Sequence, residues 1–133
     1  MEKAKGKYRD IKFFSEKNSA VLCVHNKTAR AFAAWLEKNE VVSSYEVNVP
    51  FDNQKLMNVN PVEIRSLYFQ TEWASDFLIH YVDGSKGVRE ITTIQALQKL
   101  ANVEKLELSR RYWKMMGIDN WKLVFPKEDD GTW

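Results

Sequence analysis

The sequence predicts an α/β fold with a mixed, mostly antiparallel sheet flanked by helices. Several segments alternate apolar and polar residues with the period of two that marks a half-buried strand. Two of these segments are separated by Asp83-Gly84, a strong signal for a hairpin turn. Two other segments carry the helical period. Because a helix that links two strands requires a crossover, we expect the sheet to be mixed.

The predicted strands are short and rich in Val, Ile, Tyr and Phe. Pro50 marks the end or the edge of one of them, because proline has no N–H group for the ladder. The polar segment 52–63 predicts a loop. In chain order, we expect strands at 19–24, 41–51, 64–73, 76–82, 88–94 and 120–125.

Two helices are predicted, at residues 25–39 and 95–117. In the first, Phe32, Trp35 and Leu36 fall on one face, and Asn26 or Thr28 can act as N-cap. The second shows a break near Ala101-Asn102, and Gly117 is a suitable C-terminal cap. Its apolar stripe favours packing on the sheet, while Arg110 and Arg111 are structural charges, DNA-facing charges or part of a solvated helix face.

Composition limits the class of protein. The chain has 133 residues, of which 44% are hydrophobic and 13% aromatic, so it can bury the core of one domain and is not intrinsically disordered. Its apolar runs are too short for a membrane span, and its first residues lack a secretory signal. We therefore expect a cytoplasmic protein. The single cysteine, Cys23, excludes an internal disulfide and a multi-cysteine zinc site; it is expected to pack as a small hydrophobic residue.

Charge divides the chain into three parts. Residues 1–17 carry a net charge of +3 and form a predicted basic N-terminal arm, residues 18–126 form a single near-neutral domain, and residues 127–133 form a predicted acidic tail with a net charge of −2. The arm is either a solvated terminus or a contact for a phosphate backbone. Its candidate DNA-contacting residues are Lys3, Lys5, Lys7, Arg9 and Lys12.

Two acidic residues are candidates for chemistry. Asp76 opens one predicted strand and Glu90 lies inside the next, so the hairpin at Asp83-Gly84 would make them near-opposite neighbours. Facing carboxylates repel each other unless a cation lies between them, and such oxygen ligands suit Mg²⁺ or Mn²⁺. The alternative is a pair of solvent-exposed acids at the edge of the sheet.

Read together, several motifs resemble the TnsA endonuclease family of heteromeric bacterial transposases, over roughly residues 20–126. The resemblance implies a restriction-endonuclease-like core of the PD-(D/E)xK type. The family pattern runs from a helix bearing an acid, through strands bearing the metal ligands, to a second helix. The matching residues are Tyr45-Glu46, Pro50-Phe51, Asp76-Phe77-Leu78, Asp83-Gly84, Glu90, Glu104–Leu108 and Arg110-Arg111-Tyr112-Trp113.

Two of the family's four catalytic positions differ here. By resemblance, the metal-binding Asp falls on Asp76 and the second metal ligand on Glu90. The catalytic lysine falls on Thr92, and the helix glutamate falls on Ala29, or on Thr28 if the gap is placed differently. Threonine carries no charge, and alanine binds no metal.

Neighbouring side chains could replace the missing groups. Lys99 or Lys105 could supply the positive charge, and Glu37 or Glu46 the missing acid. The resemblance implies cleavage of double-stranded DNA at transposon ends with Mg²⁺ or Mn²⁺, beside a TnsB-like transposase and a TnsC-like ATPase regulator, and no membrane. The alternative is a catalytically degenerate DNA- or protein-binding module of a mobile-element or phage complex.

Overall fold

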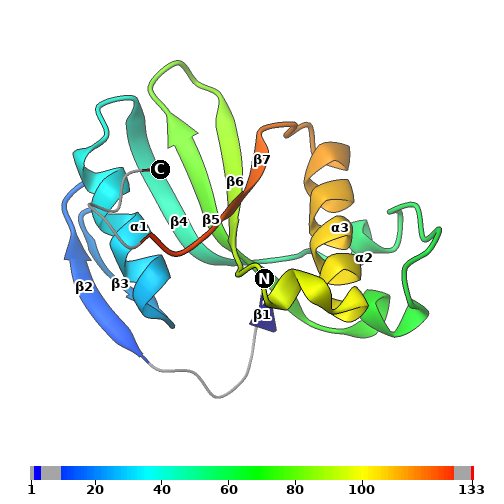
Figure 1. Ribbon diagram of the computed structural model, residues 1–133. Coiled ribbons are helices and arrows are strands. Elements are labelled where there is room, and N and C mark those ends of the chain that lie inside the picture. Colours follow the sequence, from blue (N-terminus) through cyan, green and yellow to red (C-terminus); the bar gives the residue numbers. More distant parts are fainter. Residues whose placement is uncertain (1, 4–9, 128–132) are drawn as a thin grey trace.

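The computed structural model describes residues 2–3, 10–127 and 133. Short 3₁₀ turns occupy Ser66–Gln70 and Ala96–Gln98. The helices and strands of the described residues, in chain order, are β1 (Glu2–Lys3), β2 (Ile11–Ser15), β3 (Ala20–Val24), α1 (Lys27–Lys38), β4 (Val42–Pro50), α2 (Asn53–Leu56), β5 (Trp73–Tyr81), β6 (Lys86–Ile91), α3 (Leu100–Met115) and β7 (Trp121–Val124) (Figure 1).

The main sheet is mixed and mostly antiparallel. Strands β4, β5 and β6 pair antiparallel with one another in sequence, and β7 pairs parallel to β6 after the crossover through α3. Strand β1 also pairs antiparallel with β5, whereas β2 and β3 form a separate hairpin. The prediction of an α/β fold with a mixed, mostly antiparallel sheet flanked by helices is confirmed.

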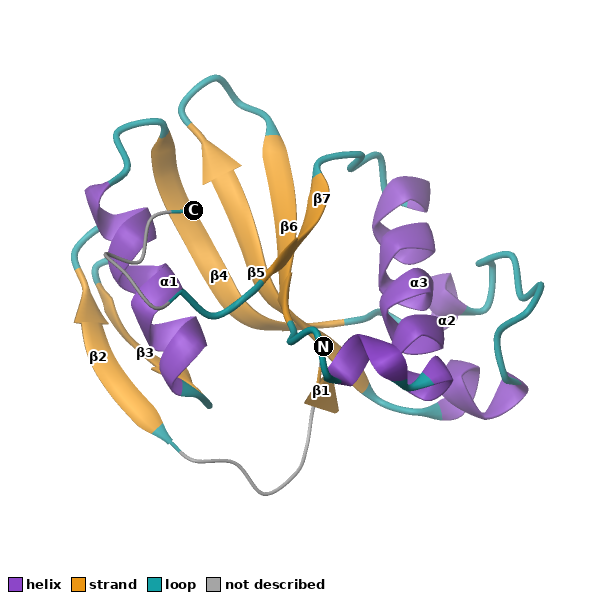
Figure 2. Ribbon diagram, viewed as in Figure 1, coloured by secondary structure: helices purple, strands orange, loops and turns teal. Residues whose placement is uncertain are grey.

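Each face of the main sheet has its own apolar core. On one face, α1 buries Phe32, Ala33 and Leu36 against Phe77 and Ile79 of β5. On the other, α3 packs against the sheet and the segment that follows β4; this core includes Phe51, Leu78, Val88, Leu108 and Tyr112. Figure 2 shows α1 and α3 on either side of the sheet, with the β2–β3 hairpin beyond α1.

Local signals define several of these elements. Asn26 is the N-cap of α1, since its side chain accepts a hydrogen bond from the Ala29 N–H at 2.8 Å. At the predicted hairpin turn, Gly84 has a φ of 88° and the Asp83 carboxylate accepts a hydrogen bond from the Ser85 N–H. Gly117, with a φ of 88°, follows the end of α3 as predicted.

The strand predicted at 64–73 is wrong. A 3₁₀ turn occupies Ser66–Gln70, and β5 begins only at Trp73. The burial pattern gives the reason: Ile64 and Tyr68 are buried, but Ser66 between them is exposed. In a strand all three would share one face, whereas a spacing of four without the middle residue fits a helical turn. The predicted break in the second helix also lies earlier than expected, at Lys99, before α3 begins.

Folded residues are found in both of the predicted terminal segments, the arm 1–17 and the tail 127–133. Strand β2 lies within the predicted arm 1–17 and pairs with β3 along its whole length, so the folded part begins before residue 18. At the other end, Trp133 belongs to the core rather than to a free tail, because its indole packs edge-on against Phe32 and donates a hydrogen bond to the Phe125 carbonyl. Among the described residues, no helix is long and apolar enough to cross a membrane.

Candidate functional site

Asp76 and Glu90 lie opposite each other where the pairing of β5 with β6 ends. The last backbone pairs are Leu78 with Val88 and Phe77 with Arg89, and the same register places Asp76 opposite Glu90. At this next pair, hydrogen bonds from backbone amides to side-chain carboxylates take the place of backbone-to-backbone hydrogen bonds. The Asp76 N–H donates to Glu90 Oε1 at 2.9 Å, and the Ile91 N–H donates to Asp76 Oδ2 at 2.7 Å. Each carboxylate therefore binds an amide of the opposite strand.

Glu90 is the centre of a buried polar network on the α3 side of the sheet. Its Oε2 accepts hydrogen bonds from the hydroxyls of Ser75, at 2.8 Å, and Ser109. These hydroxyls in turn accept from indole N–H groups, Ser75 from Trp113 at 2.7 Å and Ser109 from Trp121 at 3.0 Å. Glu90, Ser75 and Ser109 are all fully buried. Both carboxylate oxygens thus have protein donors, as a buried acid requires.

The surroundings of Glu90 change its acidity. Burial disfavours the charged form and, together with the negative charge of Asp76, raises the pKa of Glu90 to about 7. The hydrogen bonds from Ser109 and from the Asp76 amide act in the opposite direction. Near neutral pH, the protonated and the charged forms of Glu90 are therefore close in free energy in the folded chain.

Asp76 lies close to α1 because the neighbouring strand β4 reverses, at this level, the faces to which its side chains point. In a regular strand, residues two apart face the same side. Here Val47 packs in the α1 core but Val49 in the α3 core, and Asn48 between them has a φ of 51°. Asn48 is opposite Asp76 in the register of β4 and β5. The irregularity places Asp76 beside a small cavity that Ala29 of α1 also lines.

Thr92 lines a second, larger cavity of about 390 Å³ at the end of β6. The cavity lies between the beginnings of α1 and α3, with polar walls from Asn26, Thr28 and Asn102. Lys105 also contributes to its wall. The Lys105 ammonium lies 5.4 Å from the ring centre of Trp73, within cation–π range. Of the two lysines suggested as replacements, Lys105 is the one that shares a cavity with Thr92.

The fit of Asp76 and Glu90 to a divalent cation can be tested on this geometry. Mg²⁺ needs near-octahedral oxygen ligands at about 2.0–2.1 Å and usually keeps several waters. Asp76 is 8% exposed and borders a cavity, so it offers a ligand. Glu90 is 0% exposed and both of its oxygens already accept protein hydrogen bonds. As they stand, the two carboxylates do not fit a hydrated Mg²⁺ or Mn²⁺ ion.

The other candidate side chains have structural partners. The carboxylate of Glu37 accepts hydrogen bonds from Ser15 and Tyr45, and Glu46 binds His80 at 2.6 Å. Neither acid lines the cavities of Asp76 or Thr92. Lys99 is different: it is the exposed N-cap residue of α3, makes no side-chain capping hydrogen bond there and does not line either cavity.

The two arginines of α3 both pair with an acid of the same helix, and Arg111 also bonds outside it. Both guanidinium groups pair with Glu107, Arg110 at 2.6 Å and Arg111 at 2.8 Å. Arg111 also donates hydrogen bonds to the carbonyls of Asn60 and Val62, which ties α3 to the loop after α2. Arg111 therefore has a structural role, whereas Arg110 lies at the surface with 43% of its side chain exposed.

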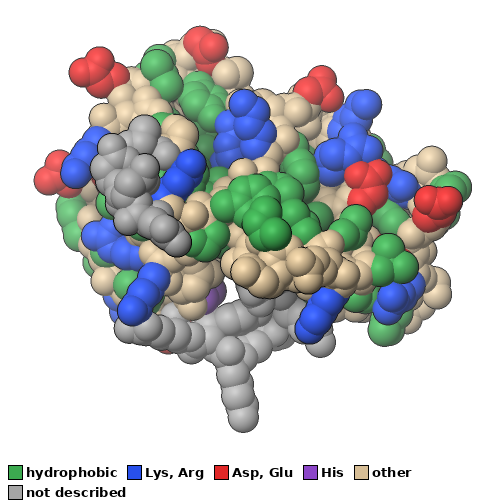
Figure 3. Space-filling view, viewed as in Figure 1, with side chains coloured by type: hydrophobic (Ala, Val, Ile, Leu, Met, Phe, Trp, Pro, Cys, Tyr) green, Lys and Arg blue, Asp and Glu red, His purple; other side chains and the backbone are tan. Residues whose placement is uncertain are grey.

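Of the five predicted DNA-contact residues, two belong to the part of the chain that the structure describes. Lys5, Lys7 and Arg9 lie outside the described residues. Lys3 belongs to β1, whose backbone pairs with Trp73 of β5, and Lys12 is exposed on β2. On the face seen in Figure 3, Lys and Arg side chains are spread out rather than gathered in one patch.

Sequence reasoning missed the partners of Glu90. Ser75 lies between two predicted strands, Ser109 and Trp113 within the second predicted helix and Trp121 within the last predicted strand, and the sequence analysis predicts no contact of theirs with Glu90. One signal was available: Ser109 interrupts the apolar stripe of the second predicted helix next to Leu108. A small polar residue on a buried helix face usually has a polar partner on the opposing element.

The chain matches no protein-family model and no curated protein. Any assignment of function therefore depends on the residues and geometry described above, together with the resemblance to TnsA carried by the sequence motifs.

Proposed function

We propose that this chain is a TnsA-like subunit with a restriction-endonuclease-like core, which binds double-stranded DNA at transposon ends and does not cleave it alone. The order of α1, β4, β5, β6 and α3 follows the order of elements in the family pattern. Asp76 and Glu90 also occupy adjacent strands, as that pattern requires. By the same resemblance, its partners are a TnsB-like transposase and a TnsC-like ATPase.

The single observation that favours binding without cleavage is the state of Glu90. Its carboxylate is enclosed by Ser75, Ser109 and the Asp76 amide, so it serves the packing of α3 on the sheet. The lysine and glutamate positions hold Thr92 and Ala29, which supply neither positive charge nor a metal ligand. Strand cleavage needs both charge stabilisation and an activated water.

An active endonuclease is the second candidate, and one observation favours it. Lys105 lines the cavity that also contains Thr92, so a lysine is present near the position where the family has one. Activity would require Glu90 to release the two serine hydroxyls and become available to a metal ion.

A cleavage assay separates the two candidates. The purified chain is incubated with supercoiled plasmid and with a linear duplex, in Mg²⁺ or Mn²⁺, beside the Asp76→Ala variant. We expect no cleavage above the level of the variant. Mg²⁺-dependent nicking by the wild-type chain that Asp76→Ala abolishes would contradict the proposal and establish the active enzyme.

Fluorescence anisotropy with a labelled duplex tests DNA binding directly. We expect affinity to fall as salt rises, because phosphate contacts release counterions. Replacing exposed Lys12 by Ala should reduce the slope of log affinity against log salt by about one. Lys114→Ala, at an exposed site on α3, is the matched control. Absence of salt-dependent binding would overturn the DNA-binding proposal and leave the protein-binding alternative.

A further inference from the structure

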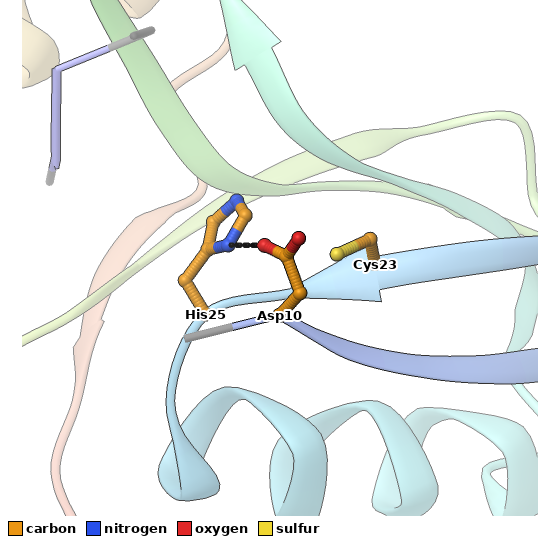
Figure 4. Close-up of side chains that lie close together, drawn as sticks. All are labelled: Asp10, Cys23 and His25. Carbon is orange, nitrogen blue, oxygen red and sulfur yellow. Dashed lines mark ion pairs between the residues drawn. The ribbon is translucent and has the colours of Figure 1, made fainter. Parts of the chain in front are cut away.

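The β2–β3 hairpin brings three different metal-ligating side chains together. Asp10, Cys23 and His25 each offer a ligand atom, and these atoms all lie within 4.8 Å of one another. Figure 4 shows the His25 ring and the Cys23 sulfur directed toward the Asp10 carboxylate. The His25 Nδ1 lies 3.5 Å from Asp10 Oδ1. A sulfur, a nitrogen and an oxygen thus converge on one point.

Strand geometry explains why these residues share a face. Lys12 pairs with Cys23 and Ile11 with Val24, so the same register continued by one residue places Asp10 opposite His25. Cys23 lies in β3 and His25 directly follows the end of that strand, so the alternation of the strand, continued by one residue, places both on the same side. The other side of the hairpin holds Ile11 and Val24, which pack into the α1 core.

We propose that Asp10, Cys23 and His25 form a binding site for a zinc ion, with water as the fourth ligand. In a tetrahedral zinc site, Zn–S is about 2.3 Å and Zn–N or Zn–O about 2.0–2.2 Å, so neighbouring ligand atoms lie about 3.3–3.6 Å apart. The His25–Asp10 separation of 3.5 Å already fits this spacing. The two remaining pairs both include the Cys23 sulfur and lie within 4.8 Å, so each closes by about an ångström when the Cys23 side chain rotates toward the other two ligands.

The donor set selects the type of metal. Thiolate and imidazole are ligands of zinc and related transition metals, whereas Mg²⁺ and Ca²⁺ prefer oxygen alone. Cys23 is a free thiol and is partly accessible, as is His25. Because His25 immediately precedes Asn26, the N-cap of α1, the ion would fasten the hairpin to the beginning of that helix. This site is independent of the proposed DNA-binding role.

Cobalt(II) is the probe, because a thiolate bound to it gives a charge-transfer band in the near ultraviolet. The reduced wild-type chain should bind one Co²⁺ with this band and with the visible bands of four-coordinate cobalt, and Zn²⁺ should remove both. Cys23→Ser should abolish the charge-transfer band. His25→Gln and Asp10→Asn should each weaken binding by about tenfold or more.

Asp119→Asn, which changes an exposed aspartate at the opposite end of the fold, should leave the Co²⁺ affinity unchanged. A thermal melt provides a second measurement: Zn²⁺ should raise the Tm of the wild-type chain but not that of Asp10→Asn, which changes a side chain that is 63% exposed. No charge-transfer band in the wild-type chain would overturn the proposal. The proposal would also be overturned if both His25→Gln and Asp10→Asn bound Co²⁺ with wild-type affinity, because the Cys23 thiol would then be the only ligand of the three that contributes.

Discussion

Glu90 is an acid whose proton affinity depends on folding. Its pKa is about 7 in the folded chain, compared with an ordinary value of 4.5. Between these values the unfolded chain has released the proton while the folded chain retains it. The folded state then binds more protons, so stability falls as pH rises from about 4.5 to about 7, and the loss is complete above the folded-state pKa.

Glu90→Gln should remove this pH dependence, because glutamine keeps the size of the protonated acid and does not ionise. In the wild-type chain, the contribution of this residue to the free energy of unfolding should fall by a few kcal/mol between about pH 4.5 and 7. We expect this fall to disappear in the variant. Urea denaturation at several pH values measures it. Glu63→Gln, at an exposed site, is the control. An unchanged slope in Glu90→Gln would show that another group controls the titration.

At the scale of single elements, Gly87 determines how closely β7 approaches β6. A Cβ at this position would meet the Asn120 side-chain nitrogen at 2.7 Å and the Tyr81 ring at 3.0 Å. Asn120 precedes β7, and its carbonyl accepts a hydrogen bond from the Val88 N–H at 2.8 Å. A side chain at Gly87 therefore displaces groups at the beginning of the parallel pair.

Gly87→Ala should lower the free energy of unfolding by about 1–3 kcal/mol, the usual cost of overpacking a buried site. Chemical denaturation measures this change. Lys86→Ala, one residue earlier and exposed, should have little effect. Equal stability of Gly87→Ala and the wild-type chain would mean that Asn120 and Tyr81 move aside without cost.

The elements could be predicted where one local signal dominated. The Asp83-Gly84 turn defined the β5–β6 hairpin and, through it, the adjacency of Asp76 and Glu90. The helical turn at Ser66–Gln70 was missed because Leu67, Tyr68 and Phe69 resemble a strand by composition. Specific contacts that composition does not show stabilise their conformation: the Trp73 indole donates to the Tyr68 carbonyl five residues earlier, and Glu104 of α3 pairs with Arg65.

The orientation of the candidate site could not be predicted. It depends on Asn48, whose positive φ turns β4 over at the level of Asp76. Asparagine tolerates this conformation better than most residues, but it is also common in ordinary strands and loops, so the residue type alone gives no warning. The zinc proposal has the same origin: Asp10 and Cys23 are 13 positions apart in sequence, and only the register of β2 with β3 brings them together.

At the scale of the whole molecule, one sheet separates two apolar cores. Leu36 lies in the core under α1 and Leu108 in the core under α3, and both are fully buried. The strands β5 and β6 contribute side chains to both. Because the cores share these strands, loss of packing on one face weakens the support for the other, and we expect the described fold to unfold as one unit.

Leu36→Ala and Leu108→Ala should each lower the free energy of unfolding by about 2–5 kcal/mol, through lost burial and a residual cavity. Unfolding followed by near- and far-ultraviolet circular dichroism should give one coincident transition in each variant. Leu67→Ala, at an exposed site, should cost far less. Two separate transitions in either variant would show that the faces unfold independently.

The hydrogen bonds at the end of the β5–β6 pair differ in kind from those along the rest of it. Peptide groups join most of this strand pair, but at Asp76 and Glu90 the bonds are made by carboxylates. A peptide carbonyl accepts a hydrogen bond at any pH, whereas a carboxylate changes as an acceptor when it binds a proton or a cation. The bonds between the two strands are therefore independent of pH up to the pair Phe77–Arg89, whereas the bonds at the next pair respond to protonation or to a bound cation.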